Sequence, residues 1–267
     1  MSDSIIIEGA ISVLSALNSD YCKVIKIILK DGIKYNSVSE ILTCAKAKNV
    51  ETQFISEDEM RELTQNYSDF TGNTHGGIIA ITSKRKFLSL NELILTLPKN
   101  KEQISIALIE GIEDPYNLGY AARALYTQGT NGLIIPERDF GFSEAVIEKS
   151  STGTFSKMPV TVFGKASDAK RDLIELLKNE KFKIYCIDKK LPANSKVEFS
   201  DIFNVKFADR TVFIIGGEKR GISKDFLDNA DEIVRIPYAK EFPHSLAAQT
   251  AATIAAYEIH RQRNRGN

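Results

Sequence analysis

The chain has 267 residues, of which 43% are hydrophobic, and its 35 Lys and Arg residues balance 35 Asp and Glu residues. This composition excludes a disordered chain and a uniform polycation, so any binding of nucleic acid must come from local basic patches. Three scattered cysteines predict a protein of the reducing cytoplasm without disulfides. The sequence contains no signal-peptide pattern. Its apolar runs are all much shorter than the roughly 20 residues that a membrane helix needs.

The first third of the chain alternates helical and strand patterns. The expected elements are a helix at 11–17, a strand at 24–29, a helix at 39–48, a strand at 51–55, a helix beginning at the acidic run 56–59, and a buried strand at 78–82. We therefore predict a small α/β domain over residues 1–98, with its linker within 84–101.

The remaining residues, 102–267, repeat a strand–helix rhythm that ends in a long helix from about Ser245 to Arg261. The expected strands are 104–109, 132–135, 160–163, 183–187, 212–215 and 232–236. Strands separated by helices of this size predict a mainly parallel sheet covered by helices on both faces. Ligands of such sheets bind beyond the carboxyl ends of strands, so the loops that follow the strands are the candidate site.

The loop after the strand 104–109 leads into a helix with one apolar face. Asn117 is the expected N-cap, and Arg123 falls on the face opposite Leu118, with Gly119 one turn before it. Asn117 and Arg123 would suit an anionic ligand such as a phosphate. A capped surface helix with a solvated arginine explains the same pattern.

A second loop follows the strand 212–215 and contains Gly216, Gly217, Glu218 and Gly221. Adjacent glycines allow close approach of a ligand or a positive φ angle. The loop is not a P-loop, because Ile222 stands where a lysine is required, and no strand is followed by G-x-G-x-x-G. This argues against a nucleotide-binding dehydrogenase or kinase.

The third segment runs from Ile236 to the alanine-rich last helix, for which Ser245 is the expected cap. His244 and Ser245 are adjacent and lie outside any G-x-S-x-G elbow, which argues against a nucleophilic serine. The chain has three His and no H-E-x-x-H motif, so no catalytic metal is expected. The basic run Lys84, Arg85 and Lys86 could contact phosphates, although a solvated charge run is the commoner explanation.

These three segments, in this order, resemble the signature of the SpoU (TrmH-type) RNA ribose 2′-O-methyltransferases of the SPOUT superfamily. The matching positions are Asn117, Gly119 and Arg123, then Gly216, Glu218 and Gly221, then Ile236-Pro237, Ser245-Leu246 and Tyr257-Glu258. The resemblance covers roughly residues 102–262. The opening residues and the segment 75–80 also resemble the ribosomal-protein-like RNA-binding domain that many members carry in front.

The resemblance implies a C-terminal trefoil knot, a homodimer, S-adenosylmethionine as methyl donor without a metal, and structured RNA, ribosomal RNA above all, as acceptor. It assigns the reaction centre to Asn117, Arg123, Glu218 and Ser245. It implies that the backbone at Gly216, Gly217, Ile236 and Leu246 binds the adenosine of the donor. The front domain, with the basic run at 84–86, would supply affinity for RNA.

One position departs from the family pattern, because Ala247 stands where members usually carry an asparagine after Ser-Leu. Gln249 is the nearest amide that could compensate. The departure keeps a second hypothesis open, in which the chain is a non-catalytic RNA-binding or ribosome-assembly factor on the same scaffold.

Overall fold

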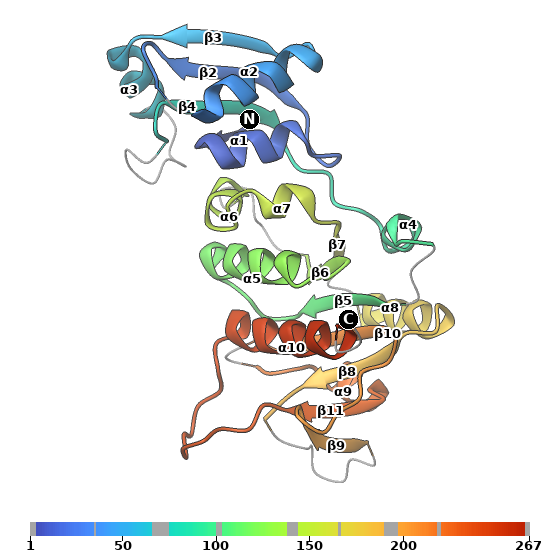
Figure 1. Ribbon diagram of the computed structural model, residues 1–267. Helices are drawn as coiled ribbons and strands as arrows, with labels where there is room; N and C mark the ends of the chain where they lie inside the picture. Colours follow the sequence, from blue (N-terminus) through green and yellow to red (C-terminus); the bar gives the residue numbers. More distant parts are fainter. Residues whose placement is uncertain are drawn as a thin grey trace. The chain divides into compact units, whose positions relative to one another are not determined.

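Figure 1 shows a computed structural model of the chain, which describes residues 4–34, 36–65, 75–99, 103–137, 144–164, 167–189, 197–217 and 220–264. By their internal contacts the residues form two compact units. The first comprises Met1–Lys86 and Asp139–Lys157, and the second comprises Phe87–Arg138 and Met158–Asn267. Residues 139–157 thus belong by contact to the first unit, whereas the sequence grouped them with the following strands. The division at 98 and 102 stays a prediction about independently folding parts.

The first unit is built on a four-stranded sheet. Its strands are β1 (Ser4–Glu8), β2 (Val24–Lys30), β3 (Glu51–Ile55) and β4 (Ile78–Ser83), in the order β1-β4-β2-β3. Its helices are α1 (Ala10–Leu17), α2 (Asn36–Ala47), α3 (Glu57–Gln65), α6 (Glu144–Ser150) and α7 (Thr154–Lys157). Side chains alternate across the sheet, so that Ile5 and Ile7 join the core of α1 and α2 while Ile6 joins Met60 of α3 on the other face.

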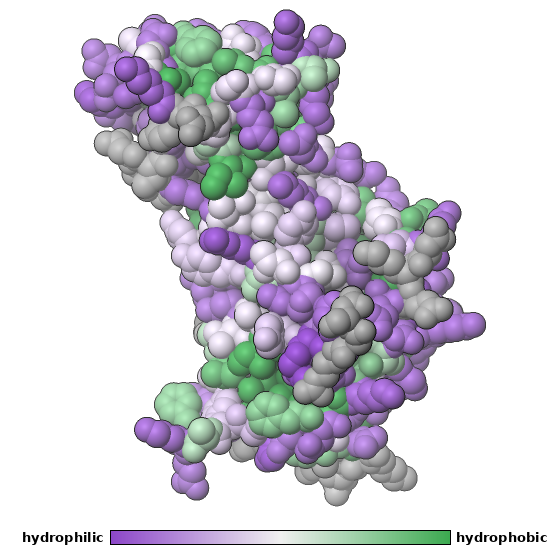
Figure 2. Space-filling view, viewed as in Figure 1, coloured by the Kyte–Doolittle hydropathy of each residue, from purple (hydrophilic) through white to green (hydrophobic). Residues whose placement is uncertain are grey.

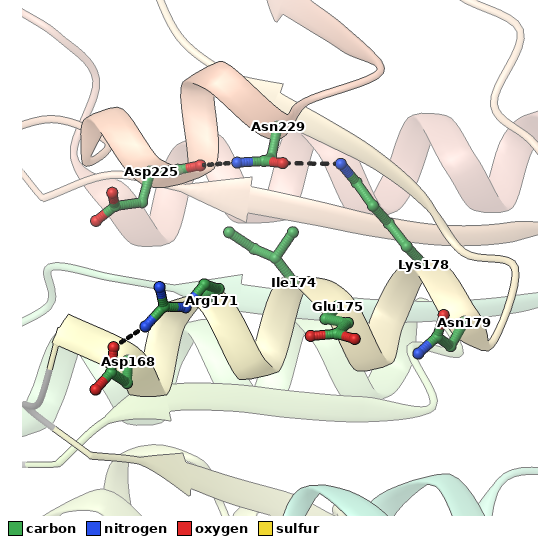
Figure 3. Close-up of a pocket in the computed structure, with 8 residues that line it drawn as sticks. All are labelled: Asp168, Arg171, Ile174, Glu175, Lys178, Asn179, Asp225 and Asn229. Atoms are coloured by element: carbon green, nitrogen blue, oxygen red, sulfur yellow. Dashed lines mark hydrogen bonds and ion pairs between the residues drawn. The ribbon is translucent and has the colours of Figure 1, made fainter.

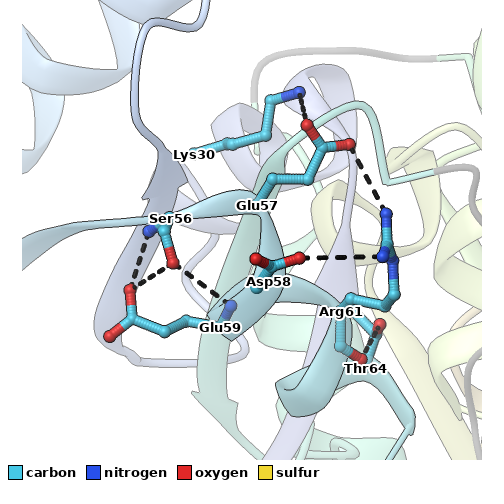
Figure 4. Close-up of polar contacts among 7 residues, drawn as sticks. All are labelled: Lys30, Ser56, Glu57, Asp58, Glu59, Arg61 and Thr64. Atoms are coloured by element: carbon cyan, nitrogen blue, oxygen red, sulfur yellow. Dashed lines mark hydrogen bonds and ion pairs between the residues drawn. The ribbon is translucent and has the colours of Figure 1, made fainter.

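The start of α3 illustrates how the sequence fixes a helix end (Figure 4). Glu59 accepts hydrogen bonds from the backbone nitrogen and the hydroxyl of Ser56, at 2.8 Å and 2.7 Å, and its own backbone nitrogen donates to the Ser56 hydroxyl at 3.3 Å. This reciprocal pair is a capping box. It confirms the acidic helix predicted to begin at residues 56–59.

The second unit contains a seven-stranded sheet in which each pair of neighbouring strands is parallel. The strands are β5 (Ile104–Ile109), β6 (Gly132–Pro136), β7 (Val160–Phe163), β8 (Lys183–Ile187), β9 (Glu198–Asp201), β10 (Arg210–Ile215) and β11 (Glu232–Arg235). Their order is β7-β6-β5-β10-β8-β11-β9. The predicted mainly parallel sheet is confirmed.

Helices cover both faces of this sheet. One face carries α8 (Ser167–Asn179) and α9 (Lys224–Asn229), whose Leu177 and Phe226 join every second residue of β5, such as Ile106, in one core. Lys178 of α8 donates to Asn229 of α9 at 2.9 Å (Figure 3). The other face carries α5 (Pro115–Thr127) and α10 (Ala248–Arg263), which pack against each other (Figure 1). A short helix, α4 (Leu90–Thr96), packs near β7.

Two predicted helix caps are wrong. The N-cap of α5 is Asp114, whose carboxylate accepts from the backbone nitrogen of Tyr116 at 2.8 Å, so Asn117 lies inside the first turn. The N-cap of α10 is Ala247, which makes no side-chain cap, and Ser245 lies two residues before it. The structure also contains the strands β1 and β9, which the sequence patterns did not indicate. No described helix is long and apolar enough to cross a membrane.

Candidate active site

Four neighbouring strands of the second unit end level with one another. Ile109 of β5 pairs with Ile215 of β10, Ile215 with Ile187 of β8, and Ile187 with Val234 of β11. Because the strands are parallel, the loops that follow them all leave the sheet at its carboxyl edge. The three sequence motifs therefore converge on one edge, with Asp188 and Lys189, which follow β8, between the second and the third.

The first two loops touch through their glycines. A Cβ atom added to Gly111 would lie 2.1 Å from the Cα atom of Gly217, and one added to Gly216 would lie 2.3 Å from the carbonyl carbon of Gly221. Of these glycines only Gly221 has a positive φ, of 64°. Gly216 and Gly217 are thus required by the close packing of one backbone on another, and not by a left-handed conformation.

Further hydrogen bonds fix the second loop. Gly217 and Gly221 bond each other through both backbone pairs, with N–O distances of 3.2 Å and 2.8 Å. The carboxylate of Glu110, which follows β5, accepts from the backbone nitrogen of Ser223 at 2.8 Å and pairs with Lys170. The loop is therefore held from both of its ends. Glu218, the fourth predicted member of this motif, lies outside the described residues.

The third loop, residues 236–247, borders a pocket of about 740 Å³ lined by Lys189 and residues 235–243. Ile236 and Leu246 are both half-buried. The hydroxyl of Tyr238 accepts a hydrogen bond from the backbone nitrogen of Leu246 at 2.9 Å, which joins the two ends of the loop. The loop extends away from the sheet in Figure 1, and Figure 2 shows hydrophobic and hydrophilic side chains together at its surface.

The first and third motifs meet through an amide pair. Gln249, in the first turn of α10, donates from Nε2 to Oδ1 of Asn117 at 3.1 Å. Its Oε1 atom is buried and has no hydrogen-bond partner among the described residues. The sequence indicated Gln249 only as the amide nearest to the missing asparagine, and the structure places it in contact with a predicted site residue.

The structure leaves two other predicted residues at the surface. Arg123 is exposed, and it lies six residues after Asn117, which corresponds to roughly 9 Å along a helix axis. Ser245 is exposed as well. Gly119, between Asn117 and Arg123, is buried.

Arg85 is misassigned as an RNA-binding residue, because it is buried in the first unit with only 6% of its surface exposed. Its guanidinium lies 4.9 Å from the ring centre of Tyr21 and 4.5 Å from that of Phe155, and it donates to the Phe155 carbonyl. Beside it, burial raises the pKa of Glu148 to about 7, and this effect outweighs the opposing attraction of the Arg85 charge. Lys84 and Lys86 are exposed, as an RNA contact requires.

A second pocket, of about 600 Å³, lies between α8 and α9 (Figure 3). Three of its charged side chains are engaged with neighbours, since Arg171 pairs with Asp168 and Lys178 bonds Asn229. None of the sequence-predicted site residues lines it. In the described part of the chain, no group of three or more His, Cys, Asp and Glu side chains could hold a metal ion.

Solved structures share this fold over nearly the whole chain. The SpoU methyltransferase AviRb from Streptomyces viridochromogenes, in complex with AdoMet, superposes with a TM-score of 0.74 at 20% identity, over 98% of this chain and 91% of its own. An RNA 2′-O ribose methyltransferase superposes with a TM-score of 0.72 at 17% identity, over 98% and 89% of the two chains. At such low identities the likeness shows the fold alone.

The sequence comparisons cover both units. A Staphylococcus epidermidis protein assigned to the TrmH family of tRNA/rRNA methyltransferases is 28% identical over 264 residues, which are 98% of this chain and 97% of that protein. Residues 6–88 match the model of the RNA 2′-O ribose methyltransferase substrate-binding domain. Residues 104–257, more than half of the chain, match the model of the SpoU rRNA methylase family. The chain therefore belongs to the SpoU rRNA methylase family, a family of RNA methyltransferases.

Proposed function

We propose that this protein transfers a methyl group from S-adenosylmethionine to a ribose 2′-hydroxyl of structured RNA, and that the RNA is ribosomal. The observation that carries the proposal is the convergence of the three motif loops at the carboxyl edge of four level strands. The match of residues 6–88 to a substrate-binding domain of ribose 2′-O-methyltransferases supports the choice of acceptor.

We assign the pocket beside the third loop to part of the donor site, because Ile236, one of the four residues proposed to hold the adenosine, lines it. Its volume of about 740 Å³ lies in the usual range for small-molecule sites, and Ile236, Pro237 and Tyr238 give it an apolar wall for a purine nucleoside. In the proposal, the backbone at Gly216, Gly217, Ile236 and Leu246 holds the adenosine. The donor, when bound, supplies an electrophilic methyl group on a sulfonium sulfur.

The chain's own residues then position the acceptor. The ribose 2′-oxygen attacks the methyl carbon in line with the departing sulfur, so one C–O bond forms and one C–S bond breaks. The electron pair of the C–S bond stays on the sulfur of the departing S-adenosylhomocysteine, and the 2′-hydroxyl proton passes to solvent water. We propose that Asn117, Glu218 and Ser245 position the ribose for this attack. Arg123 binds a phosphate of the target RNA. An arginine keeps its proton in proteins, so we do not assign the proton transfer to Arg123. Gln249 orients the Asn117 amide.

We propose that residues 1–98 supply affinity for RNA, with Lys84 and Lys86 at phosphates, and that residues 102–267 carry the reaction. RNA is recognised through shape and phosphate contacts, for which a few exposed lysines suffice in a neutral chain. The burial of Arg85 removes it from this set.

We further propose a homodimer and a trefoil knot in the second unit. Exposed tyrosines on the paired helices support the dimer, because Tyr116 and Tyr120 on α5 and Tyr257 on α10 are 39%, 52% and 54% exposed. The strand order supports the knot, because β10 is inserted between β5 and β8, which both precede it in the chain.

The test is methyl transfer from labelled S-adenosylmethionine to ribosomal RNA, followed by nuclease digestion and identification of the methylated nucleosides. We expect label in 2′-O-methylated nucleosides, and we expect Arg123→Ala to abolish transfer while calorimetry shows unchanged donor binding. Arg171→Ala, at an exposed arginine of α8, is the matched control. Label on a base would refute the ribose assignment. A protein that binds RNA but neither binds nor uses the donor would be the non-catalytic factor.

A further inference from the structure

Lys189 connects the end of one strand to the loop that follows the neighbouring strand. It lies two residues after β8, and its Nζ atom donates to the backbone carbonyl oxygens of Phe242 at 2.7 Å and of His244 at 3.3 Å. Both carbonyl groups belong to the third loop, which has no helix or strand of its own between β11 and α10. The Lys189 side chain therefore stabilises a segment that no helix or strand holds in place.

Tyr238 completes the connection. The Nζ atom of Lys189 lies 5.4 Å from the centre of the Tyr238 ring, within the range of a cation–π contact. The Tyr238 hydroxyl accepts from the backbone nitrogen of Leu246. Lys189 therefore touches the beginning of the loop through an aromatic ring and its far part through two carbonyl groups, while Tyr238 joins the beginning to the end.

These contacts matter because the loop borders the pocket assigned above to the methyl donor. Ordering a loop residue has an entropic cost, and a ligand that binds only the ordered loop has its affinity reduced by the fraction of molecules in which the loop is disordered. Contacts that order the loop beforehand therefore raise the affinity without touching the ligand.

We propose that Lys189 and Tyr238 are positioning residues that hold residues 236–246 in the conformation that binds the nucleoside of the methyl donor. This inference rests on the proposed function. It differs from direct recognition, in which the Lys189 ammonium group would bind the donor's carboxylate. The two roles are separable because methylthioadenosine carries the nucleoside and the sulfur without the amino acid part.

The experiment measures, by calorimetry, the affinity of the full-length protein and its variants for S-adenosylhomocysteine and for methylthioadenosine. We expect Lys189→Met and Tyr238→Phe each to weaken both ligands by about tenfold, in equal proportion. Lys189→Arg, which keeps donors for both carbonyl groups, should recover most of the affinity. Lys206→Met, at an exposed lysine between β9 and β10, is the control that removes one charge elsewhere in the unit.

A second measurement needs no ligand. Hydrogen exchange of the Leu246 amide in the free protein should be faster in Tyr238→Phe, a change that removes a single oxygen atom, while the melting temperature stays unchanged. Unchanged exchange, or unchanged affinity for both ligands, would overturn the inference. A loss confined to S-adenosylhomocysteine would also overturn it, in favour of direct binding of the carboxylate. If the wild-type protein bound neither ligand, the proposed function itself would fail.

Discussion

Replacing Gly111 by alanine tests whether the contact between the first two motif loops builds the site. The added Cβ atom would lie 2.1 Å from Cα and 2.4 Å from the backbone nitrogen of Gly217. Carbon atoms pack at about 3.5 Å or more, so the two backbones would have to separate by at least about 1.4 Å. A side chain could rotate out of the way, but the Gly217 backbone cannot.

The expected loss of stability follows from this clash. Overpacking of a well-packed interior costs roughly 1–3 kcal/mol, and a clash with backbone belongs at the upper end of that range. For a unit of this size, about 3 kcal/mol lowers the melting temperature by roughly 6–12 °C. Because the displaced loop carries Gly216 and Gly217, donor binding should fall by more than tenfold even at temperatures where the protein stays folded.

Scanning calorimetry and titration calorimetry with S-adenosylhomocysteine measure the two effects. Gly164→Ala is the matched control, since a Cβ atom there meets only the Cβ of Ala169, at 3.9 Å. We expect that variant to change neither the melting temperature nor the donor affinity appreciably. A Gly111→Ala protein with wild-type stability and affinity would refute the argument that loop contact shapes the site.

Three further predictions follow from single side chains. Arg85→Met should destabilise the first unit by roughly 1–3 kcal/mol in urea denaturation, because it leaves the buried Phe155 carbonyl without its donor; a loss of RNA affinity at unchanged stability would contradict this. The folded-state pKa of Glu148, about 7, lies above its ordinary value of 4.5, so the folded protein binds more protons between these values and stability should fall as pH rises through that window. Glu148→Gln should flatten the dependence between pH 5 and 8, and an unchanged slope would assign it to another group. Gln249→Leu, which removes the hydrogen bond to Asn117, should lower kcat about tenfold at unchanged donor affinity, and an equal loss of affinity would place Gln249 in donor binding instead.

The strands that the sequence predicted best are the buried ones. The predicted bounds of β5, β7 and β8 agree with the structure. β5 and β8 lie inside the sheet, where parallel strands are apolar on both faces and stand out as continuous runs, and β7, at one edge, is mostly buried as well. β9 was missed because it is an edge strand with the sequence Glu-Phe-Ser-Asp, which is only partly buried. A strand paired on one side and open to solvent on the other needs no apolar run.

Helix ends were less predictable. Asp114 and Asn117 both suit an N-cap, and the fold uses the first because α5 begins at Pro115. Ser245 suits a cap equally well, but the third loop continues through it to Ala247. Capping preferences are local and similar in strength, so the path of the preceding loop decides between them.

The amino-acid sequence alone determined the order of the motifs, the parallel sheet and the family resemblance, since each depends on residues that are close together in the chain. The tertiary structure alone decided which loops meet and which charges are buried. Arg85 looked like part of a solvated basic run, yet its backbone bonds Glu144, 59 residues later in the chain. Gln249 reaches Asn117 across 132 residues. The availability of a charged or polar group for function depends on neighbours that are distant in sequence, and folding alone brings those neighbours together.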